Sequence, residues 1–300
     1  MITRIPTRTA EIMPGQQVKR ALPNRNCPRI GAWCFLDYLH IESVDPENLD
    51  DPSKKINVAP HPHIGLQTFT WMLQGEIVHR DSLGNHSTIR PYEVNLMTAG
   101  NGIVHTEVSE PNYHGPLKTL QFWIALPKEQ SSNPPSFKHY DDLPMFSHEG
   151  LIIHLFMGKF LGYRAPTQSY SPLMGADIMA HESKTCTLPL DPEFEYGIFI
   201  TEGAVEIADE HYKDDEFIAI EAGQTSLTLT LEKGTHIALI GGTPVTEPLI
   251  IWWNFVAHDP AQIEAATRDW ANYPNKRFNQ VKHPDPPLGA PALNTRLKAR

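Results

Sequence analysis

Residues 66–74, LQTFTWMLQ, alternate between two kinds of side chain with a period of two. Phe69, Trp71 and Leu73 fall on one face, and the residues between them fall on the other. This period predicts a β-strand with two distinct faces. The 27 prolines and 19 glycines are spread along the chain between other short apolar runs, which indicates many strands joined by turns. The chain is therefore predicted to be all-β.

An internal repeat indicates two similar barrels. Residues 68–81, TFTWMLQGEIVHRD, line up with residues 196–209, YGIFITEGAVEIAD, with Gly75 on Gly203, an offset of 128. Apolar positions match around this glycine, which suggests a duplication. The polar, proline-rich stretch between Pro127 and Gly150 is the expected boundary. The predicted domains are residues 1–135 and 150–300.

One helix is expected near the end of the chain. Asp259 suits the N-cap and Pro260 the first helical position, and Ile263, Ala266 and Trp270 would form the buried stripe. The tail after Asn275 is rich in proline, and we expect it to lie extended on the surface or to be disordered.

Composition excludes some functions. A net charge of −10 argues against binding to nucleic-acid phosphates, although it leaves a protein partner open. Residues 249–253 are too short an apolar run to span a bilayer, and the N-terminus has no apolar secretory segment. Three scattered cysteines are typical of reduced thiols in a cytoplasmic protein.

Two short motifs predict a metal site. His61 and His63 are two residues apart just before the strand at Leu66, and His105 and Glu107 are two apart after a glycine turn. Residues two apart in an extended segment share a face, so each pair can approach one point. Three neutral imidazoles and a carboxylate suit one divalent transition metal, Fe(II) first and Ni, Mn, Co, Cu or Zn as alternatives. The structural alternative is that the two earlier histidines cap a strand and Glu107 is solvated.

Longer segments carry a family resemblance. Residues 61–85, HPHIGLQTFTWMLQGEIVHRDSLGN, and residues 97–107, MTAGNGIVHTE, strongly resemble the pirin family of the cupin superfamily. So does the upstream stretch NRNCPRIGAWCFLDYLH at residues 24–40. The resemblance is strongest over residues 30–126 and weaker in the C-terminal half, where it includes WWNFVAHD.

The resemblance implies two cupin barrels in tandem, with a metal only in the N-terminal barrel and with His61, His63, His105 and Glu107 as its ligands. Many pirins and other cupins have Glu where this chain has Gln67, so Glu107 is the only matched carboxylate.

The C-terminal half is expected to lack a metal. At the offset of 128, His61 and His63 fall on Pro189 and Asp191. Near the expected second glycine turn, His236 is retained but Ala238 stands where Glu would be. Of the remaining histidines, His79 and His86 flank a turn and are both predicted to be exposed, and Asp81 is expected to serve that turn.

The resemblance implies a function of the quercetin 2,3-dioxygenase type, in which dioxygen opens the heterocycle of a flavonol. Glu107 is the candidate base for the flavonol proton. An apolar wall is expected from four residues that fit the ordinary barrel core equally well: Phe69, Trp71, Met97 and Trp123. The alternatives are another small aromatic substrate and a non-enzymatic regulator, in which the metal senses redox state and the protein binds transcription or metabolic partners.

Overall fold

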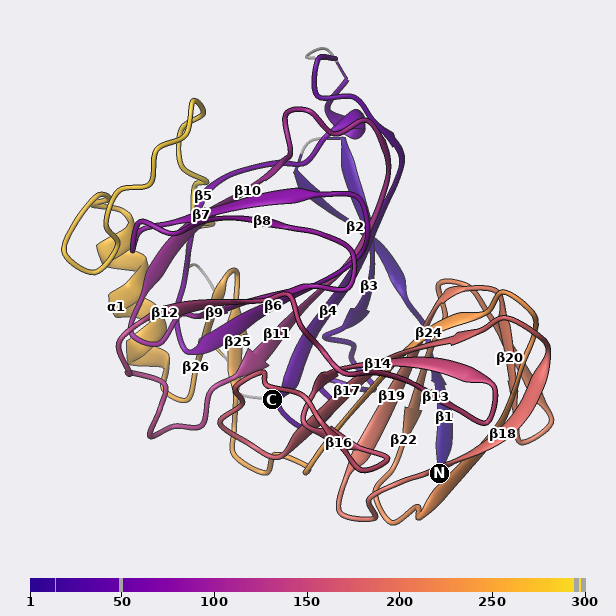
Figure 1. Cartoon of the computed structure of the whole chain (residues 1–300). Helices are drawn as coiled ribbons and strands as arrows, with labels where there is room; N and C mark the ends of the chain where they lie inside the picture. The colour runs from indigo at the N-terminus through magenta and orange to yellow at the C-terminus, as the bar shows by residue number, and fades with distance from the viewer. Residues whose placement is uncertain (14, 49–50, 294–296, 298–300) are drawn as a thin grey trace. The chain divides into compact units, whose positions relative to one another are not determined.

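The computed structural model describes residues 1–13, 15–48, 51–293 and 297 (Figure 1). Most elements in these residues are strands. Besides them there are one α-helix and a short 3-10 turn, η1 (Pro52–Lys54). The predicted all-β class is confirmed. The described residues include no helix long and apolar enough to cross a membrane. Contacts group the chain into two compact units.

The N-terminal barrel unit comprises Glu11–Val18, Leu39–His139 and Thr246–Arg300. Its barrel contains a seven-stranded sheet in the order β12-β9-β6-β11-β4-β3-β2 and a four-stranded sheet in the order β5-β10-β7-β8, although β2, β3, β4 and β12 each lie only partly within these ranges. The strands of the larger sheet are β12 (Ser136–Tyr140), β9 (Val94–Thr98), β6 (Leu66–Gln74), β11 (Gly115–Ala125), β4 (Trp33–Val44), β3 (Gln16–Leu22) and β2 (Arg8–Met13). Those of the smaller sheet are β5 (Asn57–His63), β10 (Ile103–Ser109), β7 (Ile77–Asp81) and β8 (His86–Ile89).

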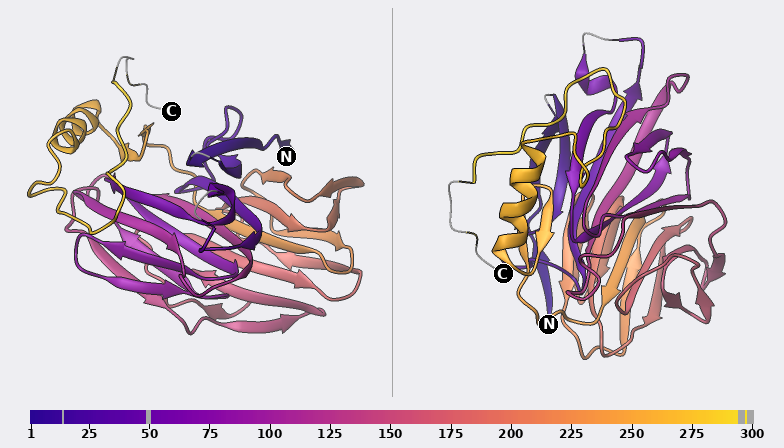
Figure 2. Two further views of the ribbon diagram at one scale, coloured as in Figure 1. Left: turned by 90° about the horizontal axis from the view of Figure 1, so that it is seen from above. Right: turned by 90° about the vertical axis from the view of Figure 1, so that its left-hand side faces the viewer.

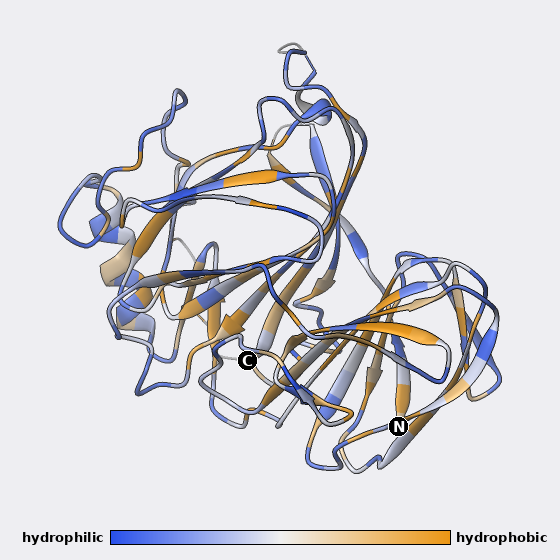
Figure 3. Ribbon diagram, in the orientation of Figure 1, coloured by the Kyte–Doolittle hydropathy of each residue, from blue (hydrophilic) through white to orange (hydrophobic). Residues whose placement is uncertain are grey.

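The C-terminal barrel unit comprises Met1–Ala10, Lys19–Tyr38 and Tyr140–Val245. Its sheets run β1-β22-β19-β24-β17-β14-β13 and β18-β23-β20-β21. The larger sheet is built from β1 (Ile2–Ile5), β22 (Phe217–Ile220), β19 (Glu195–Glu202), β24 (His236–Gly242), β17 (Leu173–Ala180), β14 (Leu151–Met157) and β13 (Met145–His148). The smaller sheet is built from β18 (Lys184–Pro189), β23 (Ser226–Leu231), β20 (Ala204–Ile207) and β21 (Glu210–Lys213), and a separate hairpin from β15 (Lys159–Phe160) and β16 (Tyr163–Arg164). Apolar residues follow the strands and hydrophilic ones the connecting loops (Figure 3).

The two sheet orders correspond position by position, as a duplication requires. In each barrel a strand of the larger sheet, β6 or β19, passes through a glycine into the smaller sheet. These glycines, Gly75 and Gly203, have φ of +89° and +83°. This left-handed conformation is open to glycine at little cost, which explains the shared residue at the centre of the repeat.

One predicted correspondence is wrong. His236 begins β24, which occupies the place of β11 in its sheet and not the place of β10. The counterpart of β10 is β23, where Leu227 and Leu229 are buried in the barrel core. Sequence comparison placed the glycine turn wrongly because connecting loops differ in length between the halves.

The helix forms as predicted. α1 spans Pro260–Trp270, the Asp259 side chain accepts the Ala261 amide at 2.9 Å, and Ile263, Ala266 and Trp270 are buried. α1 packs on β26 (Phe255–Ala257), which pairs with β25 (Ile250–Trp252) (Figure 2).

The described part of the tail has no strand or helix, but it is anchored. The Trp270 indole donates to the Leu288 carbonyl at 2.9 Å, and the Leu288 amide donates to Pro60 O at 2.9 Å. This agrees with an extended path on the surface, and residues 294–296 and 298–300 lie outside the described residues.

The grouping by contacts departs from the predicted limits of residues 1–135 and 150–300. β1 belongs to the C-terminal barrel unit because it pairs with β22, and α1 with the tail belongs to the N-terminal barrel unit because it packs on β26 and β5. Pairing between distant segments cannot be read from local composition, and the limits themselves stay a prediction.

Candidate metal centre

Two adjacent strands bring three histidines together. β10 pairs antiparallel with β5, placing His105 opposite His61 and Ile103 opposite His63. One ligand nitrogen from each histidine lies within 4.8 Å of the others. The Nε2 atoms of His63 and His105 are 3.1 Å apart. Such a separation suits two nitrogens that bind one ion rather than each other.

The three imidazoles are closed off from solvent. Their exposed fractions are 6% for His61, 2% for His63 and 1% for His105. Burial lowers the pKa of His61 to about 4 and the pKa values of His63 and His105 well below 6.5, because a charged ring is poorly solvated there. Each ring is therefore neutral at physiological pH, the form that binds metals.

Backbone carbonyls set the orientation of two rings. His61 Nδ1 lies 2.9 Å from Ala59 O, and His63 Nδ1 lies 3.0 Å from Asn254 O in the turn between β25 and β26. A carbonyl can only accept, so Nδ1 carries the proton in both rings and Nε2 keeps its lone pair for a metal.

His105 is oriented by a chain of side chains. Its Nδ1 lies 3.4 Å from His79 Nδ1, and His79 Nε2 lies 3.2 Å from Asp81 Oδ2. With Nε2 of His105 reserved for a metal, the proton on its Nδ1 is donated to His79, and His79 donates in turn to Asp81. Carboxylate-supported histidines of this kind are common behind metal ligands.

The prediction that His79 is exposed is wrong. Its side chain is buried and stacks on Phe137 at 4.4 Å. Asp81 does serve the turn, since it accepts the Leu83 amide at 2.9 Å, and His86 is exposed as predicted. The missed signal was the spacing of His79 and Asp81, two residues apart on a strand that pairs with β10.

Glu107 lies apart from the three histidines. The register between β10 and β5 shifts between His105 and Glu107, so that Glu107 pairs with Val58. The group of described residues whose ligand atoms lie within 4.8 Å contains the histidines and not this carboxylate. Burial raises the pKa of Glu107 to about 7 against the opposing effect of a hydrogen bond with Thr70. Its role as a fourth ligand stays a prediction.

Gln67 is engaged elsewhere. Its amide donates to Thr98 Oγ1 at 3.0 Å, inside the barrel wall. This contact gives Gln67 a structural role in linking β6 to β9.

The four predicted wall residues differ in their surroundings. Trp123 lies against one of the three clustered histidines, with its ring 5.2 Å from that of His63. Phe69, Trp71 and Met97 are almost completely buried, and Phe69 packs edge-on against Phe122. Contact with a substrate stays a prediction for all four.

The donor set fits a single divalent transition metal. Three neutral nitrogen donors converge, their tautomers are held by acceptors, and no positive charge opposes a cation at the rings themselves. Three imidazoles are too few to complete octahedral coordination, so positions remain for a carboxylate, water or substrate.

The C-terminal barrel unit contains another histidine cluster. His236 is hydrogen-bonded to Asp177, and His154 Nδ1 lies 3.8 Å from the other oxygen of the same buried carboxylate. His236 is therefore not the solitary histidine expected from the sequence. Within the described residues, this cluster does not gather its ligand atoms as closely as the N-terminal histidines do.

Comparison with known proteins identifies the family. Residues 15–124 match the family model "Pirin", and residues 175–277 match "Pirin C-terminal cupin domain". The chain belongs to the pirin family. Its two barrels are cupin barrels in tandem, as the resemblance implied.

Pirins similar to this chain include enzymes by name. A Pseudomonas aeruginosa protein named "Putative quercetin 2,3-dioxygenase" is 43% identical over 100% of this chain and 93% of its own length. The crystal structure of a quercetin 2,3-dioxygenase from Acinetobacter baumannii has a TM-score of 0.94 and 39% identity, covering 99% of this chain and 97% of that one. A bacterial pirin from Escherichia coli in complex with nickel(II) shares the fold, with a TM-score of 0.63 and 17% identity over 82% of this chain and 100% of that one.

Proposed function

We propose that this pirin is a metal-dependent dioxygenase that opens the heterocycle of a flavonol such as quercetin with dioxygen. The observation that carries the proposal is the convergence of three buried, neutral imidazoles in a chain similar throughout its length to proteins named for this activity. Fe(II) is the first candidate metal, and the nickel complex of another pirin makes Ni(II) the next to test.

His61, His63 and His105 would hold the metal, and Glu107 would be a fourth ligand or a neighbouring base. When bound, the metal supplies a Lewis acid for an ionised hydroxyl of the substrate. Glu107 accepts the proton of the flavonol 3-hydroxyl. A carboxylate that titrates near pH 7 is suited to take up and release a proton at neutral pH.

The surroundings exclude water and position the substrate. The low exposure of the three imidazoles keeps bulk solvent from the reacting oxygen. Trp123, beside His63, offers an aromatic face to one ring of the flavonol.

The test is turnover of quercetin by iron-loaded and nickel-loaded protein in air, followed by loss of flavonol absorbance and release of carbon monoxide. His63→Ala should abolish metal-dependent turnover, whereas His86→Ala, a change of an exposed histidine, should retain it. Glu107→Gln should lower kcat more than metal content if Glu107 is the base. Fully loaded protein without any turnover would refute the proposal and favour the alternative, a regulator that binds partner proteins.

A further inference from the structure

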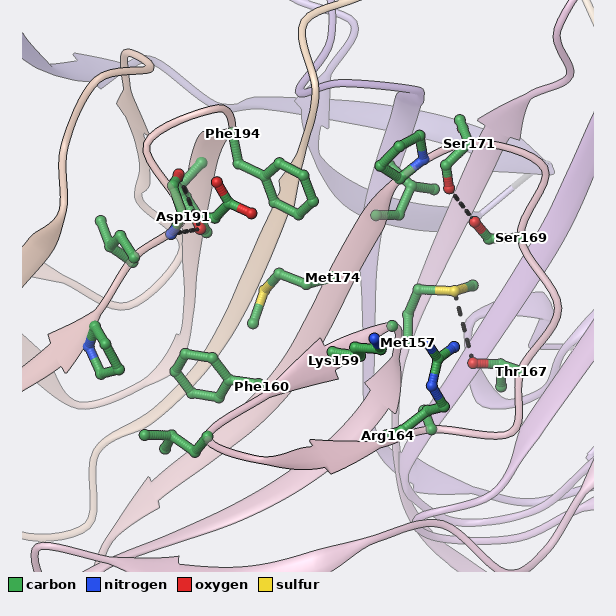
Figure 4. A pocket seen from close by; sticks show the side chains of 18 residues that line it. Met157, Lys159, Phe160, Arg164, Thr167, Ser169, Ser171, Met174, Asp191 and Phe194 are labelled. Carbon is green, nitrogen blue, oxygen red and sulfur yellow. Dashed lines mark hydrogen bonds between the residues drawn. The ribbon is translucent and has the colours of Figure 1, made fainter.

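A cavity of about 590 Å³ lies within the C-terminal barrel unit, beside the ends of β14, β17 and β18 (Figure 4). Small-molecule sites usually have volumes of roughly 300–1,000 Å³. One edge of the cavity is formed by Pro189, Leu190 and Asp191. Pro189 is the last residue of β18, which corresponds to β5 in the other barrel, and His63 is the last residue of β5. The cavity thus lies beside the same end of the equivalent strand.

One part of the cavity wall is apolar. Phe160, Met174 and Tyr196 line it and belong to the barrel core, and Phe194 lines it while remaining half-buried. In Figure 4 the side chains of Phe160, Met174 and Phe194 reach into the same space from different segments. Their combined surface favours a ligand with an apolar, planar body, because aromatic rings and a thioether pack well on such a body.

Two cationic side chains, Lys159 and Arg164, belong to the part of the cavity wall formed by the β15–β16 hairpin. Lys159 pairs directly opposite Arg164 in the register of the hairpin, and both side chains are exposed and line the cavity. Neither has an ion-pair partner in the part of the chain that the structure describes. Like charges opposite one another weaken a strand pair. An anion between them would remove this repulsion.

The backbone of the hairpin that carries the two cations is fixed. Leu161 and Gly162, its turn residues, have φ of +49° and +85°, as a tight two-residue turn requires. At its base Gly158 has φ of +74°, and a Cβ there would lie 1.9 Å from Leu173 O, so the backbone is packed directly on β17. Tyr163 stacks on Phe146 with ring centroids 3.9 Å apart. A wall fixed in this way binds a ligand without first having to be ordered.

The polar groups around the cavity differ in whether they already have a hydrogen-bond partner. Ser171 Oγ is buried and has no hydrogen-bond partner among the described residues. Thr167 is already committed, since its hydroxyl donates to Phe156 O at 2.6 Å. Asp191 lies across the cavity from Arg164 in Figure 4, and its carboxylate accepts the Glu193 amide at 3.0 Å. Apart from the Asp191 carboxylate on the far side, the groups without a partner are two cations and one hydroxyl, and the cations recognise an anionic oxygen ligand on the hairpin side.

We propose that this cavity binds a small aromatic carboxylic acid. The carboxylate lies between Lys159 and Arg164, and the apolar body packs against Phe160, Met174 and Phe194. This is a binding site separate from the metal centre, and it does not depend on the proposed dioxygenase activity.

The test uses nickel-loaded full-length protein with 3-phenylpropionate as the probe and 3-phenylpropionamide as its neutral counterpart, with affinity measured by calorimetry. The acid should bind at least ten-fold more tightly than the amide. The double variant Lys159→Gln with Arg164→Gln should weaken acid binding at least ten-fold while its melting temperature stays unchanged, because both side chains are exposed. Lys184→Gln with Lys233→Gln removes the same charge from exposed positions outside the cavity lining and should bind the acid as the original chain does.

Several results would overturn the proposal. Equal binding of acid and amide would show that the cations do not recognise the charge. Full affinity in the Lys159/Arg164 variant would place the acid elsewhere, including at the metal. Equal losses in both double variants would reveal a general charge effect, and absence of binding up to about 10 mM acid would remove the site altogether.

Discussion

Replacing Gly65 by Ala should disturb both folding and the metal centre. Gly65 has φ of +66°, and a Cβ at this position would lie 2.0 Å from the carbonyl oxygen of Val256 in β26. Neither the backbone at Gly65 nor the backbone at Val256 can move easily. The Val256 amide donates to Ile64 O at 3.1 Å, and the Gly65 amide donates to Gly100 O at 2.9 Å. The substitution therefore forces β26 away from the end of β5.

The magnitude follows from two contributions. Left-handed backbone costs an alanine about 1–2 kcal/mol, and overpacking of a fixed contact costs a further ~1–3 kcal/mol. The unfolded chain loses entropy with alanine, which offsets about 0.4–1 kcal/mol. We expect the free energy of unfolding to fall by about 2–4 kcal/mol in total. Gly84→Ala is the matched control, because Gly84 has φ of +90° but no atom within 4 Å of its Cβ position. It should lose only about 1 kcal/mol.

The same displacement should weaken metal binding. His63 is oriented by Asn254 O, and Asn254 immediately precedes β26. Loss of a hydrogen bond behind a ligand typically lowers metal affinity 10–100-fold. Urea unfolding of metal-free protein and titration with Ni(II) measure the two effects. Equal stability of the Gly65 and Gly84 variants, or unchanged nickel affinity in the Gly65 variant, would refute the reasoning.

Three further predictions concern the site and the helix. Burial raises the pKa of Glu107 to about 7 and lowers that of His61 to about 4. If Glu107 becomes a ligand, Ni(II) binding should therefore release most of one proton at pH 6 and clearly less at pH 8. Calorimetry in buffers of different ionisation enthalpy counts these protons, and a release that Glu107→Gln leaves intact would exclude coordination by this carboxylate. His79→Ala should lower nickel affinity about 10–100-fold by removing the acceptor behind one ligand, whereas His86→Ala should leave it unchanged. Asp259→Ala removes the cap of α1 and should lower the free energy of unfolding by about 1 kcal/mol in urea titrations, with an unchanged midpoint counting against the cap.

The parts of the fold that depend on local pattern were predictable from the sequence. The alternation at residues 66–74 became β6, and the signals at Asp259 and Pro260 gave the start of α1. The pairing of β1 with β22 was not predictable, because strand partners distant in sequence leave no periodic signal. For the same reason, local pattern did not indicate that α1 packs on β26 and groups with the N-terminal barrel by contacts.

The metal centre was predictable to a similar extent, wherever it depends on local pattern. Period two places His61 with His63, and pairing of β5 with β10 adds His105. Period two also predicted that Glu107 would share this face; β10 pairs with β7 in an unbroken register from His105 to Glu107, whereas against β5 the register shifts from His61 to Val58, and the role of Glu107 stays a prediction. A bulge of this kind depends on how two strands fit each other, and neither strand reveals it alone. The burial of His79 was missed for a related reason, since Phe137 covers it from β12, a strand distant in the sequence.

The two barrels differ in the hydrogen-bond acceptors available to the side chains on equivalent strands. In the N-terminal barrel unit, a turn of the C-terminal segment supplies Asn254 O to His63, and Asp81 supports His105 through His79. Buried imidazoles need such acceptors, because an unsatisfied ring N–H in an apolar interior is costly. The equivalent strand β23 places leucines in the core instead, which require no acceptor. The buried polar groups of that barrel, Asp177 with His154 and His236, lie on β14, β17 and β24 instead, and Lys159 and Arg164 remain exposed to solvent. A transplant of histidines into β18 and β23 without new acceptors should consequently bind metal poorly.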